Sequence, residues 1–266
     1  MRKLVSLVIL LGIACLYTYR LEREESRTWP AAGIAELSAG SRNGSITVTA
    51  AADSLVSAHI TRYCYGRDSA DAEKVLGNVT VEDTIVGSVL KVVSQMPSGS
   101  RPYGCKFEFT APDTVALSLS TTNGDVTVNN IAAGVNVVST NGDVALTGTA
   151  VSADLSTTNG KLIIQGHSGT VLAATTNGKI ECDLAALGPT EGCLLSTTNG
   201  AVTVWLPADV SATFDLLTTN SDVTVTGFGN VSYDVSERSH KKGRIGSGAS
   251  TVNVETSNAA ILVRSR

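Results

Sequence analysis

A short motif returns at nearly constant intervals along this chain, and it limits the fold more than any other feature. Its fullest copy, Ser-Thr-Thr-Asn-Gly-Asp-Val, begins at Ser120. Counted from Asn123, the motif asparagines are separated by 18, 18, 18, 22, 21 and 38 residues, and the last interval is close to a doubled period. With a weaker early copy, the column comprises Asn43, Asn123, Asn141, Asn159, Asn177, Asn199, Asn220 and Asn258.

An Asn-Gly pair between alternating segments normally predicts a hairpin, because both residues tolerate positive φ. The regular period changes this interpretation. An isolated hairpin leaves its apolar face without a partner, whereas stacked units bury one continuous core. The repeat therefore predicts stacked coils with one Asn-Gly corner each.

Apolar residues flank the corners with a period of two. Around Asn159, Ala153 and Leu155 precede the corner and Leu162 and Ile164 follow it. The same inward positions are apolar at the other copies, which predicts two strands per coil with one face buried. The predicted fold class is all-β, a single-chain β-solenoid of stacked two-strand coils with a period of about 18–22 residues. We expect the corner asparagines to stack as an amide ladder.

The outward positions are mostly polar, with Leu172, Leu194 and Ile163 as apolar exceptions. Aromatic residues make up only 5% of the chain, so the core is expected to be thin and built from small or β-branched side chains. This composition favours a narrow stack over a globule.

The region between residues 49 and 120 contains no clear corner, and the repeat blurs there. We predict strands at 56–64, 79–83, 89–94 and 105–110, and one or two helical turns at 71–76. The predicted organisation is a signal peptide, lipoprotein leader or membrane anchor (1–20), a linker (21–33) and a β-solenoid domain (34–266). That domain divides into an irregular part (34–115), which caps one end of the stack, and regular repeats (116–266).

The N-terminus is basic at Arg2 and Lys3 and then apolar from Leu4 to Tyr19, as in secretion leaders. Gly12-Ile13-Ala14-Cys15 is similar to a lipid-attachment site, with glycine where leucine is usual, which makes Cys15 a lipidation candidate. An uncleaved anchor and an ordinary cleaved leader are the alternatives. We expect the protein to be exported and membrane-associated through its N-terminus, on the periplasmic or cell-surface side.

The formal net charge is -4, and it becomes -6 when the two leader cations are removed. An acidic body repels nucleic acid, so DNA and RNA are not expected partners.

Four cysteines remain beyond the leader, an even number that is compatible with two disulfides in an oxidising compartment. Cys182 and Cys193 lie in inward columns on either side of one return loop, and Cys64 and Cys105 lie on apolar strand faces. Each pair is a disulfide candidate, with buried thiols as the alternative. The cysteine and histidine spacings match no metal motif, and no cofactor is expected.

One column of carboxylates raises the question of enzymatic activity. Asp125, Asp143 and Asp222 each stand two residues after a corner asparagine, but lysine or alanine interrupts the column elsewhere. Parallel β-helix enzymes that cleave polysaccharides carry carboxylate clusters on one outer face, and such residues can also bind Ca²⁺. Mixed charges favour a solvated edge, so we expect no enzymatic activity.

A basic stretch replaces the corner expected between Asn220 and Asn258. His240, Lys241, Lys242 and Arg244 are predicted to form a surface loop that contacts lipid headgroups or an acidic envelope polymer. The alternative is a surface insertion without a role.

The Thr-Asn-Gly-Asp-Val columns occur together with Pro112-Asp113 and Pro207-Ala208-Asp209 before strands, and with a closing Gly243-Arg244-Ile245-Gly246 and Thr256-Ser257-Asn258. Over roughly residues 33–266 the chain resembles the bacterial putative-adhesin family of β-strand-repeat proteins, a domain of unknown function. The resemblance implies an extracytoplasmic β-solenoid, often behind a leader or membrane anchor, and supplies no catalytic residues.

The expected function is therefore that of a non-enzymatic cell-envelope scaffold or adhesin-like binding protein, whose partner is an envelope polymer or another protein. Alternatives are a polysaccharide-active β-helix enzyme and an envelope-stress accessory protein.

Overall fold

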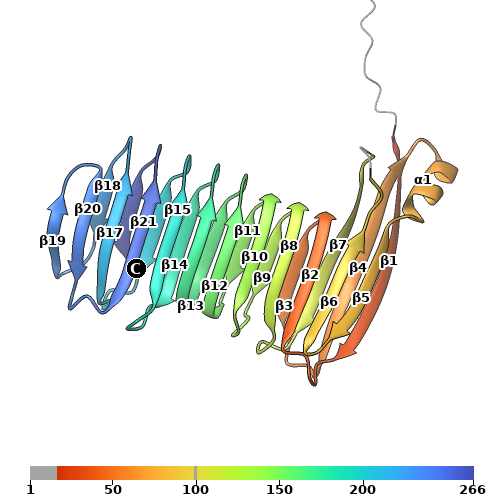
Figure 1. The fold of residues 1–266 in the computed structure, drawn as a ribbon, viewed down its shortest axis with the longest axis horizontal. Coiled ribbons are helices and arrows are strands. Elements are labelled where there is room, and N and C mark those ends of the chain that lie inside the picture. Colours follow the sequence, from red (N-terminus) through yellow and green to blue (C-terminus); the bar gives the residue numbers. More distant parts are fainter. Residues whose placement is uncertain (1–16, 99–100) are drawn as a thin grey trace, which may run out of the picture.

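A computed structural model describes residues 17–98 and 101–266 of the chain. These residues form 22 strands and one short helix, α1 (Ser69–Leu76), so the all-β class is confirmed. Strands lie side by side along the long axis, from β1 and α1 at one end to β19 at the other (Figure 1). Strands on the two sides of each Asn-Gly corner belong to two facing layers, which we call sheet I (before the corner) and sheet II (after it).

Sheet I runs in the order β5 (Thr80–Val86), β6 (Val89–Gln95), β2 (Glu36–Asn43), β8 (Ala116–Asn123), β10 (Val135–Asn141), β12 (Ala150–Thr157), the second half of β13 (Leu162–Thr175), β15 (Gly192–Thr197), β21 (Ser250–Thr256), β17 (Ala212–Thr218), β20 (His240–Ile245) and β19 (Val231–Ser236).

Sheet II runs in the order β1 (Tyr19–Pro30), β4 (Leu55–Gly66), β7 (Tyr103–Ala111), β3 (Ile46–Ala50), β9 (Val126–Asn129), β11 (Val144–Thr147), the first half of β13, β14 (Ile180–Ala186), β16 (Val202–Leu206), β22 (Ile261–Ser265) and β18 (Val223–Thr226).

Two strands joined by a corner asparagine form one rung, and the rungs do not stack in chain order. Glycine follows the corner asparagine except at Asn220-Ser221 and Asn258-Ala259. The first rung, β2–β3, lies between β6–β7 and β8–β9. The last rung, β21–β22, lies between β15–β16 and β17–β18. Rungs pair with one another in parallel, whereas the described antiparallel pairs lie toward the two ends. Both terminal rungs are thus held between neighbours, and other segments form the ends.

The alternation predicted around the corners is confirmed by burial. Leu155 and Leu195 are 1% and 2% exposed, whereas their neighbours Asp154 and Ser196 face solvent. The inward side chains of both sheets form one contiguous core that runs through the stack. A smaller cluster lies under α1, where Cys64 packs with Ala72 and Leu76. The apolar face of each rung is therefore buried against the rungs on either side of it, and no rung has a separate core of its own.

The segment predicted as a linker, 21–33, is instead mostly strand, and this prediction is wrong. β1 pairs antiparallel with β4 along its whole length, from Tyr19 opposite Gly66 to Pro30 opposite Leu55. Strands predicted at 56–64, 79–83, 89–94 and 105–110 correspond to β4, β5, β6 and β7, and the predicted helical turns correspond to α1.

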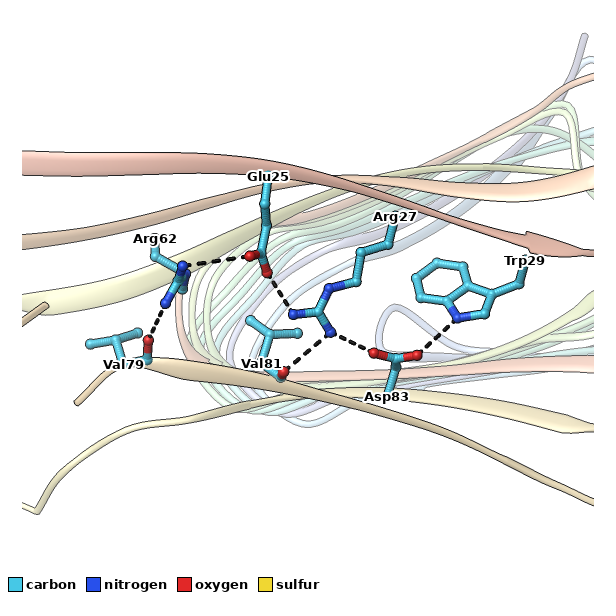
Figure 2. A network of polar contacts seen from close by, with 7 residues as sticks. All are labelled: Glu25, Arg27, Trp29, Arg62, Val79, Val81 and Asp83. Carbon is cyan, nitrogen blue, oxygen red and sulfur yellow. Dashed lines mark hydrogen bonds and ion pairs between the residues drawn. The ribbon is translucent and has the colours of Figure 1, made fainter. Parts of the chain in front are cut away.

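A polar network closes the N-terminal end of the core (Figure 2). Arg27 on β1 binds Asp83 on β5 at 2.5 Å and Glu25 at 2.7 Å. The indole Nε1 of Trp29 donates to the other oxygen of Asp83 at 2.9 Å. Arg62 on β4 lies 3.5 Å from Glu25 and donates to a backbone carbonyl at 2.8 Å. The network contains two cations and two carboxylates, so it joins the end strands of both sheets without net charge.

Candidate functional site

The corner asparagines lie in one line along the stack, joined side chain to side chain. In spatial order each amide nitrogen donates to the amide oxygen of the neighbouring asparagine at 2.7–2.9 Å, through Asn43, Asn123, Asn141, Asn159, Asn177, Asn199, Asn258 and Asn220. Asn43 ends the line by donating to the carbonyl of Tyr103 at 3.2 Å. The eight predicted asparagines therefore form one amide ladder, which fixes the lateral position of each rung.

A second line of hydrogen bonds runs inside the corners. The hydroxyls of Thr157, Thr175 and Thr197 each donate to the carbonyl of the corner glycine of the preceding rung, at 3.0–3.2 Å. Ser139 occupies the equivalent place, but its buried hydroxyl makes no hydrogen bond with any described residue. This column therefore stabilises most corners and leaves one polar group unsatisfied.

Packing, and not backbone angle, requires glycine at five of the six corner glycines; only Gly44, in the first rung, also has a positive φ, of +140°. Positive φ is the usual reason for glycine in an Asn-Gly turn, but it does not apply at Gly160, which is not among the positive-φ glycines. A Cβ on Gly160 would instead lie 1.9 Å from the carbonyl oxygen of Gly142 on the preceding rung. Stacked backbones approach so closely here that no side chain fits.

The carboxylate column has a structural role at the same corners. Asp125 accepts a hydrogen bond from the backbone N–H of Asp143 at 2.9 Å, and Asp143 accepts one from the N–H of Lys161 at 2.8 Å. Asp222 pairs with Arg238 instead. Within residues 17–98 and 101–266, no three side chains of the metal-ligating types gather in one place.

The two candidate cysteine pairs differ in the structure, and the four described cysteines are thiols. Cys182 and Cys193 are buried together, and a hydrogen bond to Cys193 together with burial raises the pKa of the Cys182 thiol. Cys64 and Cys105 pack in different clusters, and the Cys64 thiol lies 3.2 Å from the carbonyl of Ala72. Burial raises the pKa of the Cys105 thiol to about 12. Only the first predicted pair is brought together.

The basic stretch is a strand, so the prediction of a loop is wrong, whereas its contact with lipid headgroups or an acidic envelope polymer stays a prediction. His240, Lys241, Lys242 and Arg244 lie on β20, which pairs antiparallel with β17 and β19. The His240 Nε2 and Lys242 Nζ atoms lie 2.9 and 3.2 Å from the carboxylate of Asp215. Burial raises the pKa of Asp215, but the hydrogen bonds from His240 and Lys242 outweigh this and hold it below its ordinary value.

Outer face I, the solvent side of sheet I, carries an apolar groove of about 540 Å³. Leu172, Leu194 and Leu217 are 42–43% exposed there, and Leu172 and Leu194 are cross-strand partners. Asp154 and Asp215 also line the groove. The two leucines on β13 and β15 were visible in the sequence as apolar exceptions among the outward positions.

The lipidation candidate Cys15 lies outside the described residues. The one helix that the structure describes is too short and too polar to cross a bilayer. The first described residues lie at the β1 end of the stack, opposite β19 (Figure 1).

Solved structures of similar proteins come from several bacteria. A putative adhesin from Bacteroides fragilis is 16% identical with a TM-score of 0.48, covering 91% of this chain and 97% of that one. A putative cell adhesion protein from Clostridium sporogenes is 11% identical with a TM-score of 0.40, covering 92% and 100%. A putative adhesin from Parabacteroides distasonis is 9% identical with a TM-score of 0.38, covering 91% and 97%.

No curated protein matches the chain. One family model matches it over residues 30–264, from the end of β1 to the last strand, β22. The chain therefore belongs to the family described as Toastrack DUF4097.

Proposed function

We propose that this protein is a non-enzymatic cell-envelope scaffold or adhesin-like binding protein, which presents a repetitive β surface on a β-solenoid of Asn-Gly-cornered coils. The observation that carries the proposal is the register-aligned stack. Equivalent residues of successive rungs lie opposite one another, as Leu155 does between Val137 and Ala173. Two long outer faces result, on which each outward position becomes a row of side chains one strand spacing apart, about 4.8 Å.

The corner ladders support a scaffolding role. Two kinds of side-chain hydrogen bond cross between rungs. The Asn159 amide donates to the Asn141 amide, and the Thr157 hydroxyl donates to the carbonyl of Gly142. Each rung is therefore fixed by side-chain bonds as well as by the backbone. A surface held in this way loses little conformational freedom when it binds, which favours affinity for an extended partner.

The carboxylate column also favours binding over catalysis. A general acid or nucleophile needs a carboxylate that can meet the substrate, whereas Asp125 and Asp143 each direct an oxygen at a backbone N–H of the next rung. We assign these residues to the corners and not to a polysaccharide-cleaving site.

Attachment completes the proposal, and it rests on the sequence. The apolar run from Leu4 ends at Tyr19, the first residue of β1, so acylation at Cys15 or an uncleaved run would hold the stack at its β1 end. The β19 end of the stack would then lie farthest from the point of attachment (Figure 1). We propose an exported, membrane-associated protein whose partners are an envelope polymer or another protein.

Two measurements on the full-length chain test the proposal. The first is retention of the purified protein by isolated bacterial envelopes; we expect retention, and a protein that stays in solution contradicts the binding role. The second is product analysis after incubation with polysaccharides. Turnover that disappears in an Asp125→Asn, Asp143→Asn double variant would show a polysaccharide-active enzyme instead.

Attachment is tested by fractionating cells that express wild type or Cys15→Ser. Release or precursor accumulation in the variant supports acylation, and an unchanged membrane fraction supports an uncleaved anchor. Wild-type protein found wholly in the cytosol contradicts both.

A further inference from the structure

Outer face II, the solvent side of sheet II, carries a groove that differs from the apolar one on face I. Its volume is about 410 Å³, within the range of about 300–1,000 Å³ typical of ligand sites. The lining includes Ile163, Gln165, Glu181, Asp183, Trp205 and Arg266. It thus combines one large aromatic ring with amide, carboxylate and guanidinium groups.

Strand register explains why these groups lie together. Gln165 on β13 lies opposite Asp183 on β14, which lies opposite Trp205 on β16, which lies opposite Arg264 on β22. These outward positions form one row across four strands. In the neighbouring row, Ile163 lies opposite Glu181.

The Trp205 ring has different neighbours on its two sides. The guanidinium carbon of Arg264 lies 4.9 Å from the ring centroid, a cation–π contact that holds the indole in place. Arg264 does not line the groove, whereas Asp183 and Gln165, on the other side of Trp205 in the row, do. Within this row, the groove therefore lies on the Asp183 side of Trp205.

The polar groups of the groove are held by contacts of their own. Arg266 Nε lies 2.9 Å from Asp183 Oδ1, and the backbone N–H of Arg266 donates to the carbonyl of Leu206 at 2.9 Å. Glu181 is paired with Lys179 at 2.5 Å. These contacts place hydrogen-bonding groups around the ring before any ligand arrives, which lowers the entropy cost of binding.

A sugar ring matches this combination of groups. A pyranose has an apolar C–H face that packs on an indole, and a rim of hydroxyls that donate to carboxylates and accept from amides and guanidinium groups. A purely apolar partner would bury the Gln165 amide without giving it a hydrogen bond, at a cost in binding free energy. We infer that the groove between Gln165 and Trp205 is a binding subsite for a pyranose unit of a polysaccharide.

This inference rests on the proposed binding function and names its ligand class. It is tested with the full-length protein and a panel of soluble probes: chito-oligosaccharide, malto-oligosaccharide and oligogalacturonate, each titrated by calorimetry. We expect at least one probe to bind. Trp205→Ala should weaken that binding about tenfold or more, as for a central aromatic contact, and Trp205→Phe should weaken it less.

Control variants distinguish a loss of sugar binding at the groove from a loss of folding. Thr203→Ala changes an outward residue on the same strand that does not line the groove, and Leu172→Ala changes face I; both should bind as wild type. Thermal melts of each variant show whether it is folded, and Gln165→Ala supplies a second disruption with a small structural effect.

The outcomes are distinguishable from failure of the proposed function. Envelope retention without binding of any sugar probe overturns the carbohydrate subsite and leaves the scaffold proposal in place. Sugar binding that Trp205→Ala and Gln165→Ala leave unchanged also overturns the subsite. A protein that binds neither envelopes nor sugars overturns both proposals.

Discussion

The corner glycine of each regular rung lies against the backbone of the rung before it, so a Cβ on Gly160 would stand 1.9 Å from the carbonyl oxygen of Gly142. The same contact recurs at Gly178, where the distance to Gly160 O would be 1.7 Å. Glycine is thus required in the motif because neighbouring rungs stack closely, and a side chain at this position would collide with the rung before it.

Gly160→Asn should therefore destabilise the protein, because separating the rungs would break the ladder bonds on both sides. Asparagine tolerates positive φ, so it would be accepted at a position that needs glycine only for its backbone angle. Gly166 is the matched control, with φ of +65° and open space within 4 Å of the place that a Cβ would occupy. In chemical denaturation, Gly160→Asn should lower the free energy of unfolding by more than about 2 kcal/mol, and Gly166→Asn should lower it by less than about 0.5 kcal/mol. Equal losses would contradict the packing explanation.

Ser139→Thr should stabilise the corner at Asn141. A threonine there matches Thr157, whose hydroxyl donates to the glycine carbonyl of the preceding rung, and the equivalent acceptor for residue 139 is Gly124. Satisfying a buried hydroxyl should raise the free energy of unfolding by about 0.5–1.5 kcal/mol.

Two alanine variants provide the control. Ser139→Ala removes a hydroxyl without a partner and should cost little, whereas Thr157→Ala removes a bonded one and should cost about 1 kcal/mol or more. A larger loss from Ser139→Ala than from Thr157→Ala would show that the Ser139 hydroxyl is bonded in solution.

The rungs could be predicted from the sequence because burial imposes a period of two on each strand, and the asparagine ladder imposes one residue type at each corner. Leu155 and Asn159 were assigned correctly for these reasons. The spatial order of the rungs could not be predicted from the sequence. The rung β21–β22 has the same backbone edges and the same inward residue types as the other rungs, so the pattern does not show that it lies between β15–β16 and β17–β18.

The two ends were misjudged because their strands carry many charged side chains. Arg27 and Asp83 are residue types typical of solvent-exposed segments, so β1 resembled a linker, yet together they satisfy each other at the end of the core. On β20, Lys242 likewise suggested a loop, although Asp215 on the neighbouring strand balances its charge. The groove at Trp205 was missed because its members lie on different rungs; the tryptophan in an outward position was the available signal.

Leu155→Ala should cost about 2–5 kcal/mol, because a thin core relaxes only partly around the void. Asp154→Ala, one residue earlier on the opposite face of the same strand, should cost under about 0.5 kcal/mol. Denaturant titration measures both. Because rungs couple mainly to their neighbours, the Leu155→Ala melt should also broaden. Comparable losses at the two positions would show that the alternation of inward and outward residues has been misassigned, and would contradict the stacked-coil model.

Cys182 and Cys193 should form a disulfide if the protein is exported into an oxidising compartment. The two thiols are in contact, and their oxidation releases two protons and passes two electrons to the oxidant of that compartment. Alkylation of the denatured, unreduced protein followed by mass measurement should show this pair protected, while Cys64 and Cys105 are labelled. Labelling of Cys182 and Cys193 in exported protein would contradict the prediction.

His167 should make stability depend on pH. It is fully buried, its Nδ1 lies 2.8 Å from the Thr149 hydroxyl, and its Nε2 lies 3.2 Å from the Thr170 carbonyl. A neutral ring protonated at Nε2 satisfies both contacts, since the carbonyl accepts and the hydroxyl donates. Burial lowers the pKa of His167 below its ordinary value of 6.5, and the hydrogen bond to Thr170 only partly opposes this shift.

The direction of this pH dependence follows from the difference in proton binding between the unfolded and folded chains. Below a pH of about 6.5 the unfolded chain takes up a proton at this residue and the folded chain does not, so unfolding becomes more favourable as the pH falls toward the lowered folded pKa. The stability that the neutral ring contributes is fully present above a pH of about 6.5, and it is lost as the pH falls from there toward the folded pKa. Denaturation of wild type and His167→Gln should be compared at about pH 7.5 and pH 5. Wild type should lose more stability than His167→Gln between these values, and equal losses would show that the ring is protonated in the folded protein as readily as in the unfolded chain.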